Sequence, residues 1–211
     1  MPNELKGLVR IGGAAWIGSG VLFVARAVLE FLAGVPPSSG VDILTWSVSQ
    51  RTLLAISNEV LFFAALFLVP ALFVLYLGLS ASSRVWAATG CGVVGVTIPV
   101  MVMLDIIQGR LVYPVFGINA RSPDIAEFII AVFYGGLHGV YIIIGVGAVI
   151  LSVAMLRAGY QRLIVYLGII GGLLAIVGAY PYLIGPVLSA VCQMFFPAWF
   201  VAVGARLRRM E

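Results

Sequence analysis

The chain has 211 residues, of which 63% are hydrophobic and only 9% are charged, and its formal net charge is +4. Soluble domains carry about 25% charged residues, so this composition excludes an ordinary soluble globular protein. The basic residues form no interleaved basic face, which argues against nucleic acid as a partner. We therefore expect an all-α, polytopic membrane protein.

Six apolar runs along the chain are long enough to cross a bilayer, because a hydrocarbon core of about 30 Å takes roughly 20 helical residues. Turn-forming and charged residues separate the runs, as in the expected loops at 34–51 and 109–121. We predict one transmembrane domain over residues 1–211, folded as a six-helix bundle. The predicted spans cover residues 8–33, 52–79, 85–108, 123–157, 163–180 and 183–205.

The fourth predicted span, residues 123–157, has the clearest helix start. Ser122 is suited to the N-cap, and Pro123 to the first helical position, where its missing N–H costs nothing. Within this span, His138 is the only strongly polar side chain between residues 129 and 155. We therefore expect a long apolar helix with a single histidine inside it.

The basic residues are divided unevenly between the two sides of the predicted membrane domain. Arg51, Arg110 and Arg121 fall on one side. The side that holds both termini carries eight: Lys6, Arg10, Arg84, Arg157, Arg162, Arg206, Arg208 and Arg209. The positive-inside rule then predicts cytoplasmic termini and a multi-pass protein in the bacterial inner membrane.

Small residues four positions apart let helix backbones approach closely in lipid. We expect such pairs to pack within the molecule first, and between copies only second. The pairs are Gly135 with Gly139, Gly168 with Gly172, and Ala14 with Gly18.

Polar side chains in most of the spans fall in the half that faces away from the cytoplasm. Counting residues from the cytoplasmic ends, at about 1.5 Å per residue, places Arg26 about 24 Å up and Gln193 about 20 Å up. Glu30, Glu59, Asp105 and His138 all come out near 28–32 Å by the same rise of about 1.5 Å per residue. The sequence therefore predicts a layer of polar groups at similar heights. The candidate pocket residues are Arg26, Glu30, Asn58, Glu59, Asp105, His138 and Gln193.

Arg26 needs a partner or a water-filled cavity, because an unpaired charge at that depth costs a few kcal/mol or more. Glu30 lies one turn away on the same helix face, so a local pair is one expectation. Asp105 and Glu59 are the candidates on other helices. The sequence leaves these three partners open.

The single histidine, His138, has two interpretations. It is either a packing residue that bonds a neighbouring oxygen, or part of a working site, since imidazole is the side chain that ordinarily titrates near neutral pH. We predict that its ring faces the bundle, within reach of Glu59 or Asp105 directly or through one water.

No standard catalytic or nucleotide-binding motif occurs, and one histidine cannot build a histidine-rich metal site, so we expect no metal. Cys91 and Cys192 lie inside apolar segments without C-x-x-C spacing and are expected to be small buried residues. The sequence leaves unknown whether a cofactor is bound, and it leaves open whether the protein is an enzyme.

The order of several local features resembles a known family. These features are Arg-Ile-Gly-Gly at 10–13 in the first helix, the fourth helix, and the segment 156–162 leading to Leu-Gly at 167–168. The chain resembles the uncharacterised bacterial membrane family catalogued as domain of unknown function 4386. The resemblance covers nearly the whole chain and implies six spans, not an activity. Gln161 stands where a proline is common, and Gln193 near where a glutamate is frequent.

The leading interpretation is an integral membrane protein with an outward-facing polar pocket, serving as a small-ligand binding, transport-related or accessory membrane component. Expected partners are membrane lipids, a small hydrophobic or amphipathic ligand, and a second copy or another membrane subunit. One alternative is an intramembrane enzyme acting on a lipid or isoprenoid-like substrate, with Glu59, Asp105 or His138 as acid or base. The other is a structural subunit of a larger membrane complex.

Overall fold

The computed structural model describes residues 3–209, with side chains described from residue 6, and its regular structure in this range is entirely helical. An isolated bridge between Val115 and Ile118 is the one strand-like pairing in the described part. The helices are α1 (Asn3–Ala33), α2 (Gly40–Ser49), α3 (Arg51–Val112), α4 (Pro123–Arg157), α5 (Arg162–Gly178), α6 (Pro181–Ile184), α7 (Pro186–Gln193) and α8 (Phe195–Arg208).

Four helical stretches are long and apolar enough to cross a membrane: Lys6–Ala33, Arg51–Val112, Pro123–Arg157 and Pro186–Arg208. The apolar helix α5 is shorter, with 17 residues. The predicted all-α class is therefore confirmed, and the four long apolar helices support the prediction of a membrane protein. The expected fourth helix has the observed bounds of α4, although the side chain of Ser122 makes no capping hydrogen bond.

Helix α3 is a hairpin of two helical arms that turns back at Ser83, whose φ of −152° and ψ of 51° are not helical. Side chains tie the two arms together along their length. Arg51 Nε donates to the carbonyl of Val112 over 3.0 Å, and Cys91 Sγ lies 3.5 Å from the carbonyl of Leu72. The runs predicted at 52–79 and 85–108 correspond to these two arms.

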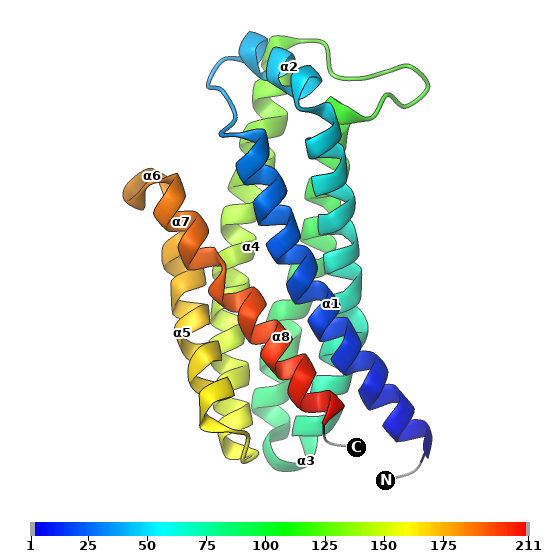
Figure 1. The fold of residues 1–211 in the computed structure, drawn as a ribbon, viewed down its shortest axis with the longest axis vertical. Helices are drawn as coiled ribbons and strands as arrows, with labels where there is room; N and C mark the ends of the chain where they lie inside the picture. Colours follow the sequence, from blue (N-terminus) through cyan, green and yellow to red (C-terminus); the bar gives the residue numbers. More distant parts are fainter. Residues whose placement is uncertain (1–2, 210–211) are drawn as a thin grey trace.

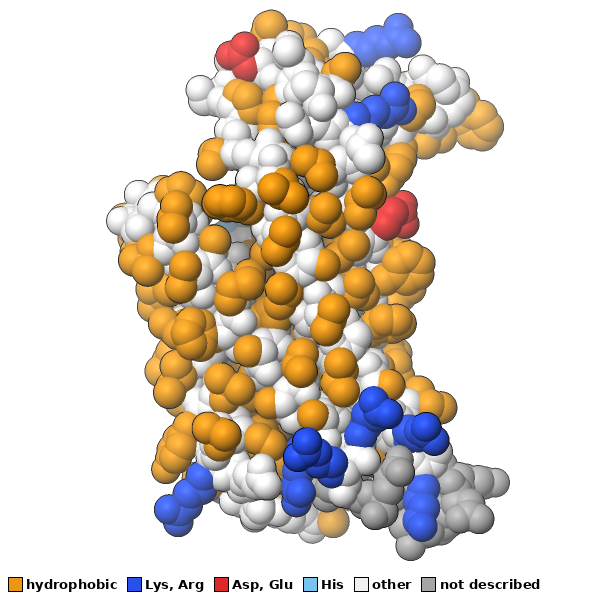
Figure 2. Space-filling model, in the orientation of Figure 1, with side chains coloured by type: hydrophobic (Ala, Val, Ile, Leu, Met, Phe, Trp, Pro, Cys, Tyr) orange, Lys and Arg blue, Asp and Glu red, His pale blue; other side chains and the backbone are white. Residues whose placement is uncertain are grey.

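The bundle is elongated, and both ends of the described chain lie at the same end of it (Figure 1). Helix α1 packs on α3 and α8, while α4 packs on α3 and α5. Figure 2 shows basic side chains gathered at the end where the termini lie and a broad apolar middle. This distribution is the one expected of a bundle that lies in a bilayer with one basic side.

Aromatic side chains fill the contact between α1 and α8. The Trp16 ring meets the Phe200 ring edge-on with 4.6 Å between centroids, and Phe23 meets Phe196 at 5.2 Å. Trp16 is fully buried, and its Nε1 donates to the carbonyl of Ala71 over 2.8 Å. The indole thus fills the core and satisfies its only donor on α3.

The predicted loop at 34–51 contains a helix that we did not expect, α2. Ser39 is its N-cap, and the Ser39 hydroxyl accepts a hydrogen bond from the N–H of Asp42. The sequence Ser-x-x-Asp at 39–42 carried this signal, since a serine followed by an acid three residues later is typical of helix starts. At its two ends, Gly40 N donates to Glu127 Oε1 over 2.6 Å, and Trp46 Nε1 donates to the carbonyl of Ala33 over 2.8 Å.

The predicted last span, residues 183–205, is not one continuous helix. Gly185, with φ of +84°, separates α6 from α7, and the chain breaks again between α7 and α8 at Met194. Pro197 explains the second break, because it has no N–H to donate to the carbonyl four residues earlier.

The expectation for small-residue packing holds for some glycines and is wrong for one pair. A Cβ on Gly172 would lie 2.6 Å from the carbonyl oxygen of Gly145, so α4 and α5 cross in backbone contact there. Gly168 is also tightly packed, against Ser152. By contrast, a Cβ on Gly135 or Gly139 would meet nothing within 4 Å, so that pair does not form a helix contact.

Candidate ligand pocket

Arg26 is the buried charge around which the site is built. Its side chain is 2% exposed and forms an ion pair with Glu30 one turn away on α1. Arg26 Nη1 also donates to the hydroxyl of Tyr141 on α4 over 2.8 Å, and its guanidinium lies 5.7 Å from the ring centroid of Phe133. Of the three partners left open by the sequence, Glu30 is the observed one.

Two helices therefore hold the arginine: α1 supplies the neutralising charge, and α4 supplies a hydroxyl and an aromatic face. A cation over an aromatic face is attracted to the ring electrons, and the attraction grows when water is excluded. In the part of the chain with described side chains, the pair with Glu30 is the only ion pair. Arg26 is thus well compensated without any other acid in contact.

Glu30 also faces a cavity of about 880 Å³ bounded by α1, α4, α6 and α7. The Glu30 side chain is 23% exposed, whereas Arg26 lies behind it and does not line the cavity. The walls are mostly apolar, with Phe31, Leu137 and Val187 among them. Polar groups reach the cavity from Tyr134, Tyr141, His138, Ser189 and Gln193.

The position of the cavity follows from the break in the last helical stretch. In Figure 1, α6 and α7 end well below the end of the bundle that carries α2, beside α4 and the last turns of α1. Three lining side chains at the cavity edge, Phe31, Tyr182 and Val187, are 69–75% exposed. The cavity therefore opens on the side of the bundle, among apolar side chains.

His138 lies in the cavity wall but has no acidic contact. Its Nδ1 lies 2.6 Å from the carbonyl oxygen of Ala179, just after α5, and its ring meets the Tyr180 ring edge-on at 4.7 Å. The direct contact that we predicted with Glu59 or Asp105 does not form among the described side chains. The ring faces protein, as expected, but toward the turn after α5.

Gln193 and Ser189, both on α7, bond the end of α5. Gln193 Nε2 donates to the carbonyl of Gly178 over 2.8 Å and lies 3.2 Å from Ser189 Oγ. Ser189 Oγ donates to the same carbonyl over 2.5 Å. These bonds satisfy a carbonyl in the last turn of α5, to which no later N–H of the helix donates. They also hold α7 against α5.

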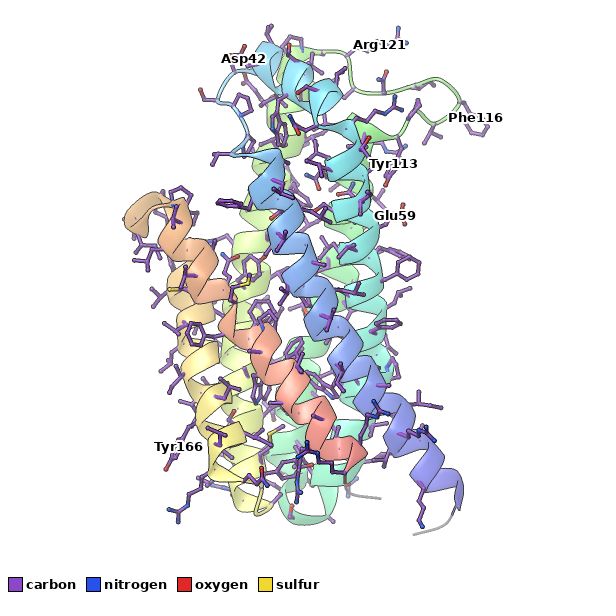
Figure 3. All side chains as sticks on the ribbon, viewed as in Figure 1. Asp42, Glu59, Tyr113, Phe116, Arg121 and Tyr166 are labelled. Carbon is purple, nitrogen blue, oxygen red and sulfur yellow. The ribbon has the colours of Figure 1, made fainter. Side chains whose placement is uncertain are left out.

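The predicted Glu59 and Asp105 do not join this cavity. Glu59 is exposed, accepts a hydrogen bond from the Tyr113 hydroxyl over 3.1 Å, and lies on the side of the bundle away from α6 and α7 (Figure 3). Asp105, on α3, is also absent from the residues that line the cavity.

Asn58 is buried at 1% exposure, and neither polar atom of its side chain has a hydrogen-bond partner in the described residues. One oxygen of Asp105 and the side-chain oxygen of Gln108 are also buried without a described partner. Burying a polar group costs free energy unless the group is hydrogen-bonded. The α3 hairpin therefore contains buried polar atoms whose cost no described hydrogen bond offsets. Gln108 was missing from the predicted set.

The structure thus divides the predicted layer into two groups. Glu30, His138 and Gln193 line one cavity, with Arg26 bonded behind Glu30. Asn58, Glu59 and Asp105 belong to the α3 hairpin. The prediction missed Tyr134, Tyr141, Tyr182 and Ser189, which sequence reasoning passed over because tyrosine and serine are common in apolar helices.

No group of three or more His, Cys, Asp and Glu side chains able to hold a metal ion occurs within the described residues. Comparisons of the chain with family models, with curated proteins and with solved structures found no match.

Proposed function

We propose that the protein binds a small amphipathic molecule inside the membrane, as a binding, transport-related or accessory component. The cavity of about 880 Å³ carries this proposal. Small-molecule sites typically occupy about 300–1,000 Å³ and combine apolar walls with a few convergent polar groups. The cavity beside Glu30 has this size and this composition.

The proposal includes six membrane spans with both termini in the cytoplasm of a bacterial cell. Helix α3 has 62 residues, which correspond to about 93 Å at about 1.5 Å per residue, and it folds back at Ser83. Its two arms therefore count as two spans, with α1, α4, α5 and the α7–α8 stretch as the others. The basic end of the bundle in Figure 2 supports the orientation.

In this orientation the cavity lies in the outward half of the membrane, and its side opening faces lipid. An apolar molecule dissolved in the bilayer could enter between α1 and α7 without crossing water. The exposed apolar side chains of Phe31 and Val187 at the opening support this route. Membrane lipids and lipid-soluble metabolites are the corresponding class of ligands.

The geometry supports binding better than intramembrane catalysis. Glu30 is engaged by Arg26, and the Nδ1 of His138 is engaged by a backbone carbonyl, so neither is arranged as a base beside a nucleophile. The resemblance to domain of unknown function 4386 stays a prediction and adds no activity to this proposal.

Native mass spectrometry of the protein extracted with its lipids tests the proposal. Gly135 lines the cavity, and a side chain built there meets nothing within 4 Å, so Gly135→Phe places a ring in the cavity without a clash at its Cβ. We expect wild-type protein to retain a small molecule and Gly135→Phe to lose it. Gly139→Phe, one turn away with equal room and outside the cavity wall, is the matched control. Retention of the same molecule by both variants would refute binding in this cavity.

A further inference from the structure

The cavity proposed above as a ligand site presents one fixed charge. Glu30 is the only Asp, Glu, Lys or Arg side chain among the residues that line it. Arg26 is not accessible from the cavity, because it is 2% exposed and is enclosed by Glu30, Tyr141 and Phe133. A ligand that enters the cavity therefore meets a carboxylate before it meets any cation.

The neutral polar groups of the wall also offer acceptors. The carbonyl of Ala179 can only accept, so the hydrogen of this bond is carried by His138 Nδ1. Gln193 directs its amide nitrogen to the Gly178 carbonyl and to Ser189, which leaves its oxygen as an acceptor. The Ser189 hydroxyl donates its hydrogen to the Gly178 carbonyl, so its oxygen can only accept from a ligand. The tyrosine hydroxyls can donate or accept a hydrogen bond, so they favour neither an anionic nor a cationic ligand.

Aromatic rings complete the wall. Phe31, Tyr134, Tyr141 and Tyr182 all line the cavity. The electron-rich face of such a ring attracts an organic cation, and several rings together commonly recognise quaternary ammonium groups.

We propose that the ligand of this cavity is an amphipathic amine or other organic cation, with an apolar body and its positive group beside Glu30. This inference rests on the proposed function and specifies the ligand class. An anionic ligand would need to displace Glu30 from Arg26 and would meet the side-chain oxygen of Gln193. The lateral opening suits a molecule whose apolar body stays in lipid until its charged end reaches the aromatic wall.

Tetraphenylphosphonium and tetraphenylborate test the charge preference, because they have nearly the same size and shape and opposite charges. Binding of each probe is measured on the full-length protein in nanodiscs, with empty nanodiscs subtracted. We expect tetraphenylphosphonium to bind at least about tenfold more tightly than tetraphenylborate. A primary amine, 4-phenylbutylamine, should compete with it, whereas 4-phenylbutyrate should not.

Variants locate the binding. Tyr182→Leu removes a cavity ring that is 73% exposed, so folding should be little affected, and we expect tetraphenylphosphonium affinity to fall about five- to tenfold. The matched control is Tyr166→Leu on α5, a tyrosine 54% exposed and far from the cavity (Figure 3), which should bind normally. Glu30→Gln should weaken tetraphenylphosphonium binding about tenfold if this variant folds. If the Glu30→Gln variant does not fold, the affinity of Tyr182→Leu tests the inference.

The outcomes separate the ligand class from the site itself. Stronger binding of tetraphenylborate that Tyr182→Leu abolishes, or a retained anionic molecule lost in Gly135→Phe, would overturn the amine inference and leave the binding function standing. Equal tetraphenylphosphonium affinity for wild type, Tyr182→Leu and Glu30→Gln would overturn the inference by placing the probe elsewhere. Absence of any retained molecule and of any probe binding would overturn the proposed function as well.

Discussion

Arg26 is deeply buried, and its charge is neutralised locally, although its Nε has no hydrogen-bond partner among the described residues. Its partners are a carboxylate on its own helix and a hydroxyl and a ring on α4. Such a group contributes little net stability while it is paired, since desolvation of both charges offsets their attraction. Its removal has a different consequence, because the Glu30 carboxylate would remain without its cation.

The substitution Arg26→Leu should therefore destabilise the protein strongly. In soluble proteins, breaking a buried pair by removing one member costs about 3–5 kcal/mol. The double variant Arg26→Leu with Glu30→Gln should recover part of the loss, because no charge is then left unpaired. Thermal unfolding in detergent, followed by fluorescence, measures both.

Arg162→Leu, at an exposed position at the start of α5, is the control and should leave the melting temperature nearly unchanged. Rescue by Asp105→Asn in place of Glu30→Gln would contradict the observed pairing. An unchanged melting temperature in Arg26→Leu would contradict a buried ion pair with any acid.

His138 connects two parts of the chain that are 41 residues apart, through its bond to the carbonyl of Ala179. Replacement by leucine removes this bond, which is worth about 1 kcal/mol for a typical side-chain hydrogen bond. We expect His138→Leu to lower stability by about that amount and to speed amide hydrogen exchange at residues 180–185, the turn it holds. If exchange in that turn is unchanged while exchange near Glu59 rises, His138 acts on the α3 side instead.

At the scale of the element, contact between α4 and α5 depends on two glycines. The carbonyl oxygens of Gly145 and Gly172 each lie within 2.6 Å of where a Cβ on the other residue would stand. Both obstructing atoms belong to the backbone, so no side chain can rotate away to make room. The two helices must separate if either glycine gains a methyl group.

Gly145→Ala should consequently destabilise the bundle by about 1–3 kcal/mol, the usual cost of overpacking. Gly139→Ala in the same helix has open space at its Cβ and should be neutral or stabilising by up to about 1 kcal/mol, because alanine favours helix more than glycine does. Chemical unfolding of both variants in the same detergent gives the comparison. Equal stability of the two variants would contradict the backbone contact between α4 and α5.

At the scale of the whole molecule, the proposed placement in a bilayer rests on the apolar surface of the bundle and on its basic end. Exposed large apolar side chains occur along the long helices, from Val21 on α1 to Val146 on α4. In water, such a surface would drive association, whereas in a bilayer it needs no partner. The two ends of the bundle differ in charge, and this difference is the basis of the proposed orientation.

Reporter fusions test the proposed orientation. Fusions after Arg84 and after the C-terminus should both report a cytoplasmic position, because eight of the twelve basic residues lie on that side. A fusion inside 109–121 should report the opposite side. An extracytoplasmic C-terminus with a cytoplasmic Arg84 would remove the even number of spans and would place the cavity in a different half of the membrane.

Local signals determined most of the helices from the sequence alone. The bounds of α4 were predicted correctly, since Ser122 and Pro123 favour a helix start and the glycine at 159, which has φ of +74°, favours an end shortly before it. The sequence by itself also determined the membrane class, because no soluble packing can bury so large an apolar fraction. The sequence did not reveal the break at Met194. The missing N–H of Pro197 favours a break there, whereas the strongly apolar run around it favours a continuous spanning helix.

The site was determined only in part. Counting residues from the helix ends gave the polar groups a common height, which is a coordinate along the bundle axis. The rotation of each helix and its place around that axis depend on close packing, such as the contact of Gly145 with Gly172, and no local signal encodes them. Tertiary structure therefore decided that Glu30, His138 and Gln193 share a cavity while Glu59 lies on the other side, since residues at one height can face different neighbours.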